Sequence, residues 1–349
     1  MNIGVPSETK PGERRVGLDA QSVRALAGEG FAVRIERGAG AGIGVADEDF
    51  AHAGATVVAR DEAWASDLVV KVKEIQDGEW KRLRPGATLF SFQHLVGAPV
   101  LTRHLAAAGV TVIAFEMVRD AQGGFPILAP MSILAGRLAI DAAAAHGAAL
   151  ARVLVLGAGH AGREAVRRAL ERGLQVSVLC RREASCDALR AEFGDRIEAG
   201  IATPAAIERA ALAADAIVGA VFVAGSATPK FLSRALVARM KRGAVIVDVC
   251  IEEGGIAESS RPTSHAQPTF VEHGVVHYAV GNMPALVPEV ATAALAKAAL
   301  PFIRSLAAKG TLRALHDDAG LRAGTLLWNG QVTDEALAKE AGMPCSPLP

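Results

Sequence analysis

The sequence predicts an α/β protein of two domains, in which a doubly wound, parallel-sheet domain is inserted into a second α/β domain and two long helices link them. Three observations support this prediction. Short apolar runs alternate with amphipathic segments along most of the 349 residues. A glycine-rich turn follows one apolar run near the middle of the chain. Two long alanine-rich segments flank the part of the chain that contains this turn.

The first 125 residues have the pattern of a parallel sheet covered by helices. Amphipathic segments at Ala20–Ala27 and Pro99–Ala108 predict helices. The segment Ala121–Pro130 contains two Gly and two Pro and predicts a linker. Short apolar runs between these features predict strands at Asn2–Val5, Phe31–Ile35, Leu68–Lys71, Thr88–Phe90 and Val110–Ala114.

The second half of the chain continues this alternation. A long helix is expected from Met131 up to the glycine-rich turn, and another over roughly Val287–Ala308. The tail from Thr311 to Pro349 has two short amphipathic pieces that are expected to pack on the first domain. Later strands are predicted at Asp215–Ala220, Ala244–Asp248 and Val275–Ala279.

The glycine-rich turn predicts a dinucleotide site of the Rossmann type. It lies between an apolar strand and an alanine-rich helix, and a second strand ending at Cys180 follows. Gly157 would permit the tight turn, Gly159 would let the backbone approach a pyrophosphate, and Gly162 would let helix and strand pack closely. The N–H groups at the start of the helix would then face the phosphates. A glycine turn in an unrelated α/β protein would not explain why the three glycines fall in this register.

The composition suits a globular enzyme with a large core and excludes some partners. Hydrophobic residues make up 51% and charged residues 21%, and the formal net charge is zero. Nucleic acid and acidic membrane surfaces are therefore poor candidates as partners. The four cysteines form no CxxC pair and no metal-like spacing, so reduced thiols and no metal site are expected. No signal peptide or uninterrupted membrane span is expected, which predicts a cytoplasmic protein.

Ordered motifs run along nearly the whole chain. Besides the glycine turn, they are Gly4-Val5-Pro6-x-Glu8-x-Lys10, Glu13-x-Arg15-Val16, Lys71-Val72-Lys73-Glu74, Phe92-x-His94-Leu95, Ala129-Pro130-Met131-Ser132, Ala135-Gly136-Arg137, Met240-Lys241-x-Gly243-Ala244-Val245, Ser260-Arg261-Pro262-Thr263 and Asn282-Met283-Pro284. In these motifs the chain resembles the alanine dehydrogenases and the related nucleotide-binding subunit of proton-translocating transhydrogenase. The resemblance implies reversible, nicotinamide-dependent oxidative deamination of an amino acid such as L-alanine, or reduction of the corresponding imine. The expected partner is thus a small molecule: a 2-oxo acid, an amino acid or an amine.

The resemblance implies catalytic roles for three residues. Arg15 would bind the substrate carboxylate, since a guanidinium can bind both oxygens at once, whereas Arg14 is expected on the surface. Lys73 would contact the substrate carbonyl. On pattern alone, Lys71 and Lys73 share one face of a strand end, where lysines are more often solvated. His94 would be the acid/base because imidazole exchanges protons near neutrality, although a histidine at a strand end is more often structural.

Glu252 stands where the resembling dehydrogenases carry aspartate. One added methylene moves the carboxylate by roughly 1.5 Å. Displacements of about 1 Å at a reacting centre can cost about a hundredfold in rate. Either the substrate differs and the site has been reshaped, or Glu252 has another role. Glu252 is retained as a site residue whose role stays open, and glutamate here is closer to the transhydrogenase subunit.

The end of the second nucleotide-domain strand bears on the choice of cofactor. NAD-binding folds usually carry Asp or Glu there to bind the ribose 2′-hydroxyl. This strand ends at Cys180, followed by Arg181 and Arg182, and the first acid is Glu183. Two guanidiniums without a carboxylate predict a preference for NADP(H), with NAD(H) possible. The alternative is that one arginine stacks on adenine, the other faces water, and NAD(H) is still accepted.

Further cofactor contacts are implied by the resemblance at Ser132, Asn282 and Met283, which match contacts to phosphate and nicotinamide. On local pattern alone, Ser132 would be a helix N-cap and Asn282 a turn residue. His160 and Ala161 lie inside the glycine turn. His160 could face the phosphates, although packing or solvent exposure is the commoner role for such a histidine.

The expected organisation is a substrate domain formed by residues 1–128 and 300–349 and a dinucleotide-binding domain with linking helices over 129–299. Ligands are expected in the crevice between them. The resembling family has a longer glycine-rich connector before the first nucleotide-domain strand, whereas this chain passes almost directly from Ala148-Ala149-Leu150 to Val153. We therefore expect a homo-oligomer, with a dimer favoured over a hexamer.

Two other functions stay open at this point. A condensing imine reductase of the opine type, which joins a 2-oxo acid to the amino group of an amino acid, would use the same carboxylate clamp. A transhydrogenase-like nucleotide-binding subunit would have no independent activity. Arg15, Lys73 and His94 together count against the second alternative, because a binding module needs no substrate clamp.

Overall fold

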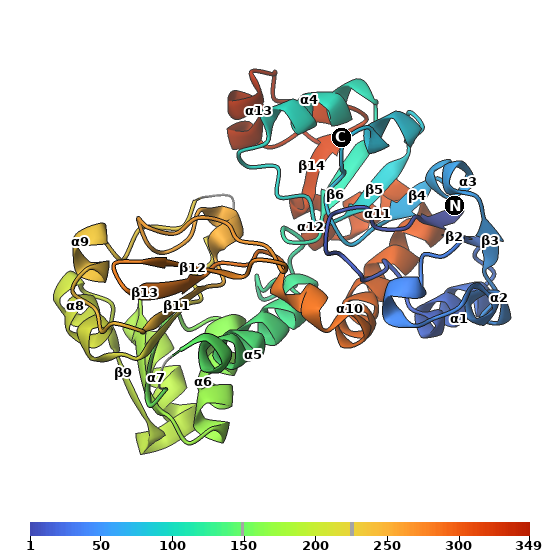
Figure 1. Ribbon diagram of the computed structural model, residues 1–349. Coiled ribbons are helices and arrows are strands. Elements are labelled where there is room, and N and C mark those ends of the chain that lie inside the picture. The colour runs from blue at the N-terminus through green and yellow to red at the C-terminus, as the bar shows by residue number, and fades with distance from the viewer. Residues whose placement is uncertain (148–149, 224–226) are drawn as a thin grey trace. The chain divides into compact units, whose positions relative to one another are not determined.

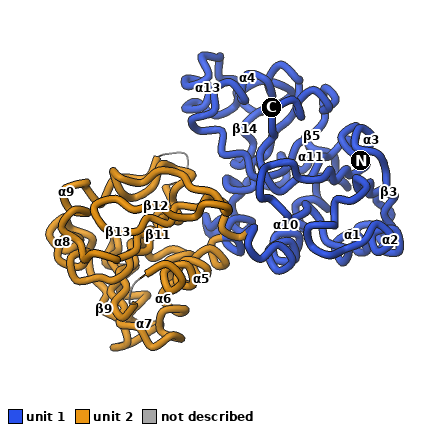
Figure 2. The backbone as a smooth tube through the Cα atoms, viewed as in Figure 1, with its two compact units in different colours: residues 1–131, 285–349 blue, residues 132–284 orange. Residues whose placement is uncertain are grey.

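The computed structural model describes residues 1–147, 150–223 and 227–349. The chain divides into two compact units (Figure 2). Unit 1 consists of Met1–Met131 and Ala285–Pro349, and unit 2 of Ser132–Pro284. Each unit has a mostly parallel sheet with helices packed against it (Figure 1), so the predicted α/β fold class is confirmed.

The sheet of unit 1 has the strand order β15-β14-β6-β5-β4-β1-β2-β3. Strands β1 to β6 pair in parallel, whereas β14 pairs antiparallel with β6 and with β15. The winding of the chain reverses between β1 and β4, which makes that point the topological switch of the sheet. The strands are β1 Ile3–Val5, β2 Val33–Glu36, β3 Thr56–Val58, β4 Leu68–Val70, β5 Thr88–Ser91, β6 Thr111–Ala114, β14 Thr325–Trp328 and β15 Gln331–Val332.

Local sequence accounts for the helix ends of unit 1. Asp19 caps α1, because its carboxylate accepts a hydrogen bond from the backbone N–H of Ser22 at 2.8 Å. Pro99 and Pro288 occupy the first position of α4 and α10, where a missing N–H costs nothing. The helices are α1 Ala20–Gly28, α2 Asp47–His52, α3 Arg60–Trp64, α4 Pro99–Ala107, α10 Pro288–Lys309, α11 Thr311–Asp317, α12 Ala319–Ala323 and α13 Glu335–Ala341, with 3-10 turns η1 Ala41–Ile43 and η2 Glu79–Arg82.

The C-terminal tail corrects one prediction. Instead of two amphipathic pieces, residues 311–349 form three helices and two strands, and β14 extends the unit 1 sheet. The strands Thr56–Val58 and Ile197–Ile201 were also not predicted. All these runs are short, and periodicity alone does not separate a short apolar strand from a buried helical segment.

The sheet of unit 2 has the order β12-β13-β11-β10-β7-β8-β9. Its strands pair in parallel except β12, which is antiparallel to β13. The six parallel strands follow the doubly wound order of dinucleotide-binding domains, and the winding reverses between β7 and β10. The strands are β7 Arg152–Leu156, β8 Gln175–Cys180, β9 Ile197–Ile201, β10 Ala216–Gly219, β11 Val245–Asp248, β12 Thr269–Glu272 and β13 Val275–Tyr278.

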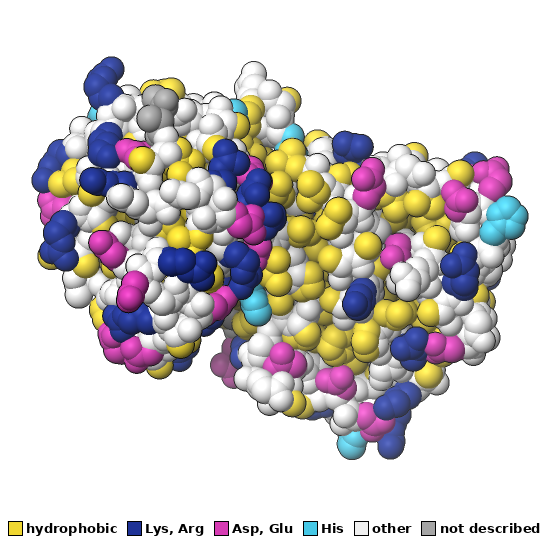
Figure 3. All heavy atoms as spheres, turned by 90° about the horizontal axis from the view of Figure 1, so that it is seen from below, with side chains coloured by type: hydrophobic (Ala, Val, Ile, Leu, Met, Phe, Trp, Pro, Cys, Tyr) yellow, Lys and Arg dark blue, Asp and Glu magenta, His cyan; other side chains and the backbone are white. Residues whose placement is uncertain are grey.

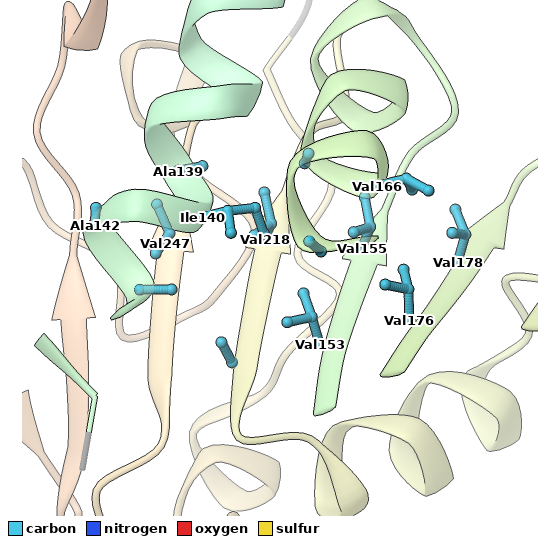
Figure 4. Packing of buried hydrophobic residues seen from close by; sticks show 14 of the residues in the cluster. Ala139, Ile140, Ala142, Val153, Val155, Val166, Val176, Val178, Val218 and Val247 are labelled. Carbon is cyan, nitrogen blue, oxygen red and sulfur yellow. The ribbon is translucent and has the colours of Figure 1, made fainter. Parts of the chain in front are cut away.

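Helix α5 (Leu128–His146) packs on the sheet of unit 2. It begins inside the predicted linker, three residues before Met131, because Pro130 falls in the first turn, where its missing N–H has no partner to lose. Figure 4 shows its Ala142 beside Val247 of β11 and its Ile140 beside Val218 of β10, with the valines of β7 and β8 farther along the sheet. The remaining helices are α6 His160–Glu171, α7 Glu183–Phe193, α8 Pro204–Ala213 and α9 Arg234–Val237, with 3-10 turns η3 Gly194–Arg196, η4 Ile251–Glu253 and η5 Met283–Leu286.

Helix α5 also lies directly against the start of α6. A Cβ atom at Gly136 would lie 2.0 Å from the carbonyl oxygen of Ala161, so no other residue fits there without movement. Ion pairs extend the contact: Arg137 pairs with Glu171 at 2.8 Å, and Arg168 pairs with Asp141 at 2.8 Å. Such pairs are partly exposed and individually weak. Figure 3 shows other basic and acidic side chains that also lie next to one another on the surface.

Helices α5 and α10 are both long and apolar enough, by length and composition, to cross a membrane. A core helix meets the same criterion, and α10 buries Leu295, Ile303 and Leu306 in unit 1. The buried share of the apolar window is 33% in α5 and 44% in α10, so core packing accounts for part of their apolar composition.

Candidate functional site

The glycine-rich turn lies at the winding reversal of unit 2. Gly157 has φ +111°, and a Cβ atom there would lie 2.2 Å from the carbonyl oxygen of Ala220, directly after β10. A Cβ atom at Gly162 would lie 2.1 Å from the carbonyl oxygen of Gly157. A Cβ atom at Gly159 would meet no atom within 4 Å. Two glycines are thus required by packing, and the third leaves open space beside the backbone.

The start of α6 can receive an anionic group. Gly159 is the N-cap residue of α6 and offers no side chain to satisfy the first N–H groups of this helix. His160 is exposed and Ala161 is half-buried. Because the N-terminal N–H groups and the helix dipole favour negative charge, a phosphate fits this position beside Gly159.

The side chains at and directly after the end of β8 are neutral or positively charged. Cys180 is buried, and burial together with the neighbouring thiol of Cys186 raises the pKa of Cys180 to about 12, so the thiol stays protonated. Arg181 and Arg182 are both exposed. The nearest acid in the sequence, Glu183, pairs with Arg190 at 2.7 Å.

Glu252 lies in the same part of unit 2 as the segment Gly281–Met283. A Cβ atom at Gly281 would lie 3.3 Å from Cγ of Glu252, so the glutamate side chain passes over this glycine. Asn282 has φ +64° and lies in a turn, as its local pattern predicts, and Met283 is buried. The structure therefore places Glu252 beside Gly281, the residue directly before two predicted cofactor contacts.

Asp248 organises the loop that carries Glu252 and was missed by the sequence analysis. Its Oδ2 accepts hydrogen bonds from the backbone N–H of Ile256 at 2.8 Å and from Oγ of Ser260 at 2.5 Å. Burial raises the pKa of Asp248, and the two hydrogen bonds oppose the shift. Two features of the sequence could have indicated this role of Asp248: its position at the end of a predicted strand, and the motif that contains its partner Ser260.

Ser132 corrects a local prediction. It is the fifth residue of α5, which begins at Leu128, and is therefore not the N-cap of the helix. Its side chain is half-buried. Pro130 had suggested a later start, but a proline within the first turn does not end a helix.

In unit 1, Arg15 is buried and paired. Its Nε donates to Oε1 of Glu13 at 2.8 Å, and its Nη2 donates to Oε2 of Glu13 at 2.6 Å. Its Nη1 lies 3.1 Å from Sδ of Met131. Arg14, in contrast, is exposed, as expected. The guanidinium predicted to bind a substrate carboxylate is therefore already held by a carboxylate of the protein.

The two lysines after β4 are buried, so the prediction from local pattern that they are solvated is wrong. The strand ends at Val70, and Lys71 and Lys73 are only 0% and 3% exposed. Lys71 lies 3.1 Å from Oε2 of Glu8 and 3.6 Å from Oε2 of Glu79. Burial raises the pKa of Glu8, and the charge of Lys71 opposes this shift. Lys71 thus compensates carboxylates in the interior.

Lys73 is held through its backbone. Its N–H donates to Oε2 of Glu8 at 3.3 Å, and the N–H of Val72 donates to Oε1 of Glu8 at 2.6 Å. Burial would raise the pKa of Glu74, but the charges of Lys73 and Lys10 outweigh it and lower that pKa. The buried carboxylate of Glu8 therefore fixes the segment that presents Lys73.

His94 follows β5 and has an unusual backbone. Its φ is +43°, in the left-handed region that non-glycine residues seldom adopt. Its N–H donates to Oε1 of Glu116 at 2.7 Å, and the N–H of Gln93 lies 3.2 Å from each oxygen of Glu116. The half-buried ring stacks on Phe92, with centroids 6.0 Å apart. Glu116, at the end of β6, stabilises this conformation.

Lys73 and His94 thus come three residues after the ends of β4 and β5, and Arg15 comes ten residues after the end of β1, the neighbour of β4 in the sheet. Glu252 and the predicted cofactor contacts belong to unit 2. Glu8, Glu13 and Glu116, which bind the backbone or side chains of the predicted residues, were not predicted as site residues from the sequence. Their signal was weak: Glu8 and Glu13 stand in the quoted motifs, but their partners depend on the fold. Within the described ranges, no group of three His, Cys, Asp or Glu side chains could hold a metal ion.

Comparison with known proteins agrees with this arrangement. Residues 4–135 match the family description "Alanine dehydrogenase/PNT, N-terminal domain", and residues 133–335 match "Alanine dehydrogenase/PNT, C-terminal domain". The chain belongs to the alanine dehydrogenase/PNT family. The resemblance stated from the sequence motifs is thereby confirmed.

Members of the alanine dehydrogenase/PNT family match over nearly the full length of the chain. Alanine dehydrogenase of Halomonas elongata is 41% identical over 361 residues, covering 98% of this chain and 97% of the relative. Alanine dehydrogenase of Mycobacterium tuberculosis H37Rv is 41% identical over 365 residues, covering 99% and 98%. A solved L-alanine dehydrogenase has a TM-score of 0.91 at 40% identity, covering 97% of this chain and 98% of that one. A transhydrogenase from Sinorhizobium meliloti, with a TM-score of 0.84 at 24% identity over 96% and 100% of the two chains, shows the shared fold.

The different surroundings of Lys71 and Lys73 give a test with matched substitutions. Lys71→Met leaves Glu8 without its cation, so we expect the free energy of unfolding to fall by about 3–5 kcal/mol. Lys73→Met leaves Glu74 paired with Lys10 at 2.6 Å, so the fold should be retained. Its turnover with a 2-oxo acid should fall by about a hundredfold or more, because the donor predicted to polarise the substrate carbonyl is lost. Denaturant unfolding and steady-state kinetics on both variants measure this, and equal effects of the two substitutions on both quantities would contradict the assignment.

Proposed function

We propose that this chain is an amino acid dehydrogenase that catalyses reversible oxidative deamination of L-alanine to pyruvate and ammonium with a nicotinamide cofactor. One observation carries the proposal. Three side chains suited to this chemistry, Arg15, Lys73 and His94, follow adjacent strand ends in a chain 41% identical to an alanine dehydrogenase over 98% of its length.

Arg15 and Lys73 are the substrate-binding cations in this proposal. The guanidinium of Arg15 binds the substrate carboxylate through charge-assisted hydrogen bonds. The ammonium of Lys73 donates to the carbonyl oxygen of the 2-oxo acid, which draws electron density from the carbon that receives hydride. Both side chains are at most 3% exposed, and a low-dielectric surrounding strengthens such contacts.

His94 is the acid/base in this proposal. In the direction of deamination, the amino acid gives up one ammonium proton to solvent, loses a hydride from Cα and becomes an iminium ion. Water then adds to this carbon, the C–N bond breaks, and the nitrogen leaves as ammonium with both protons of the water. The nicotinamide cofactor, when bound, accepts the hydride and returns it in the reverse reaction. The imidazole of His94 takes a proton from the adding water and returns it to the departing nitrogen. The contact between Glu116 and the His94 N–H keeps the ring in place for this transfer.

The cofactor-binding residues all lie in unit 2. The phosphates bind at the start of α6, beside Gly157, Gly159, His160, Ala161 and Gly162, where the open side of Gly159 gives them room. In the same proposal, Ser132, Asn282 and Met283 contact phosphate and nicotinamide. The position of Glu252 over Gly281 supports a role for Glu252 in holding the Asn282 segment.

The finer choice of cofactor in this proposal is NADP(H). Position 180 carries a neutral thiol, whereas a carboxylate at this position would repel a 2′-phosphate. The exposed guanidiniums of Arg181 and Arg182 supply positive charge next to it. Glu183, the nearest acid in the sequence, forms an ion pair with Arg190.

We further propose that the protein is a cytoplasmic homodimer. Apolar side chains remain exposed where α10 begins: Leu286 is 46% and Val290 57% exposed. Figure 3 shows hydrophobic side chains gathered on one face of the protein. The short connection that favours a dimer includes residues 148 and 149, which lie outside the described residues.

Turnover by the purified chain tests the proposed function. We expect pyruvate and ammonium to support oxidation of NADPH, and L-alanine to support the reverse reaction. Ornithine or lysine in place of ammonium should give no turnover; turnover with those amines alone would instead identify a condensing imine reductase. Absence of turnover with every 2-oxo acid and amine would identify a binding subunit and contradict the proposal.

Coenzyme preference can be tested at the end of β8. We expect the wild-type protein to have the lower KM for NADPH. The double substitution Arg181→Ala with Arg182→Ala should raise the KM for NADPH about tenfold or more, because charge-assisted contacts to the 2′-phosphate are lost. The KM for NADH should change little. Arg209→Ala, at an exposed arginine of α8, is the matched control. A wild-type preference for NADH would refute the NADP(H) assignment.

The assembly proposal has its own measurement. Light scattering after gel filtration should give the mass of two chains. Val290→Asp places a charge on the exposed start of α10, and we expect it to shift the mass to that of one chain. A wild-type mass of six chains would contradict the dimer.

A further inference from the structure

Glu13 is the most fully engaged carboxylate near the predicted substrate-binding cations. Its side chain has no exposed surface, and that of Arg15 is 2% exposed. Oε1 of Glu13 accepts hydrogen bonds from the backbone N–H groups of Arg14 at 3.1 Å and Arg15 at 2.9 Å, and from Nε of Arg15 at 2.8 Å. Oε2 accepts from Nη2 of Arg15 at 2.6 Å. The carboxylate thus holds both the backbone and the side chain of Arg15.

This contact decides which edge of the guanidinium can meet a substrate. A guanidinium has a side edge formed by Nε and Nη2 and an end formed by Nη1 and Nη2, and each can bind a carboxylate through two hydrogen bonds. Glu13 takes the side edge. At the end, Nη1 lies 3.1 Å from the thioether Sδ of Met131, a weak acceptor. A substrate carboxylate received at this end would take the place of that thioether contact.

The same contact also reduces the positive charge that a substrate meets. A buried guanidinium without a counterion would bind any carboxylate strongly but would cost much free energy to bury. Pairing with Glu13 offsets that cost and leaves Arg15 fixed in one orientation before substrate arrives. A cation that is already oriented loses less entropy when it binds its ligand.

We infer that Glu13 is a positioning residue: its carboxylate fixes Arg15 so that the end of the guanidinium receives the carboxylate of the 2-oxo acid. This inference rests on the proposed function, which makes Arg15 the carboxylate-binding residue. Glu13 touches no substrate in this assignment and acts only through Arg15.

The backbone around Glu13 has further supports, so its charge can be removed without losing the turn. The N–H of Glu13 donates to the carbonyl oxygen of Lys10 at 3.0 Å, and the N–H of Val16 donates to Oγ1 of Thr292 at 3.3 Å. A Cβ atom at Gly42 would lie 2.2 Å from the carbonyl oxygen of Arg14, which shows close packing on the other side. Glu13→Gln keeps an acceptor oxygen for the N–H groups and is therefore the conservative variant.

Steady-state kinetics of Glu13 variants test the inference. We expect Glu13→Ala to lower kcat/KM for pyruvate by about a hundredfold, as for a displaced contact at the reacting centre. Glu13→Gln should lower it by about tenfold, since one charged hydrogen bond is lost. The KM values for ammonium and the cofactor should not change. Arg14→Ala, at the exposed neighbour, is the matched control and should match the wild-type protein.

Two comparisons separate positioning from a merely structural role. Pyruvamide has no carboxylate, so its residual turnover should be the same in the wild-type protein and in Glu13→Gln. In an Arg15→Ala background, Glu13→Ala should change kcat/KM by no more than about twofold, because the two residues act as one unit. Cofactor binding by fluorescence checks that each variant is folded.

The outcomes distinguish the two proposals. Wild-type turnover with no change in pyruvate kinetics in the Glu13 variants, or equal losses with pyruvate and pyruvamide, would overturn the inference alone. Wild-type turnover that survives Arg15→Ala would overturn the role of Arg15 and with it the inference. A wild-type protein inactive with every 2-oxo acid would overturn the proposed function itself.

Discussion

The parallel pairing of strands is the constraint on which the candidate site depends. Neighbouring parallel strands end at the same edge of a sheet, so residues that follow them in the sequence meet there although they are far apart in the chain. In unit 1, Arg15, Lys73 and His94 follow β1, β4 and β5 in this way. In unit 2, Gly157 and Glu252 follow β7 and β11, and both sheets reverse their winding beside the first strand of the unit. The two predicted sites therefore depend on the same topological feature, one in each unit.

Burial imposes a second constraint on unit 1, because each chemically important group there requires a partner. A charge removed from water is costly unless a counterion or hydrogen bonds compensate it. Lys71 and Glu8 compensate each other, and Glu8 in turn binds the backbone of the Lys73 segment. Glu116 satisfies the N–H groups beside His94. The acidic residues of this candidate site therefore have two functions: they hold the backbone through hydrogen bonds, and they balance the buried positive charge.

The sequence predicted the fold class, most strands and the glycine turn, because alternation and glycine spacing are local signals. The family is confirmed by the full-length matches. Other features depended on contacts that no local pattern shows. Lys71 is buried because Glu8 and Glu79 come from two other segments, and β14 joins the sheet only through pairing with β6. Ser132 was misplaced because Pro130 suits a first helical turn as well as a linker. The roles of the site residues stay predictions.

The contrast between Cys180 and its two successors has a consequence for how this protein can evolve. Arg181 and Arg182 face solvent, so changes there alter the surface without disturbing the core. Cys180 is 1% exposed in surroundings that already resist ionisation. An aspartate at that position would have to carry its charge into the same interior. Substitutions at the arginines should therefore cost little stability, whereas an acid at position 180 should cost considerably more.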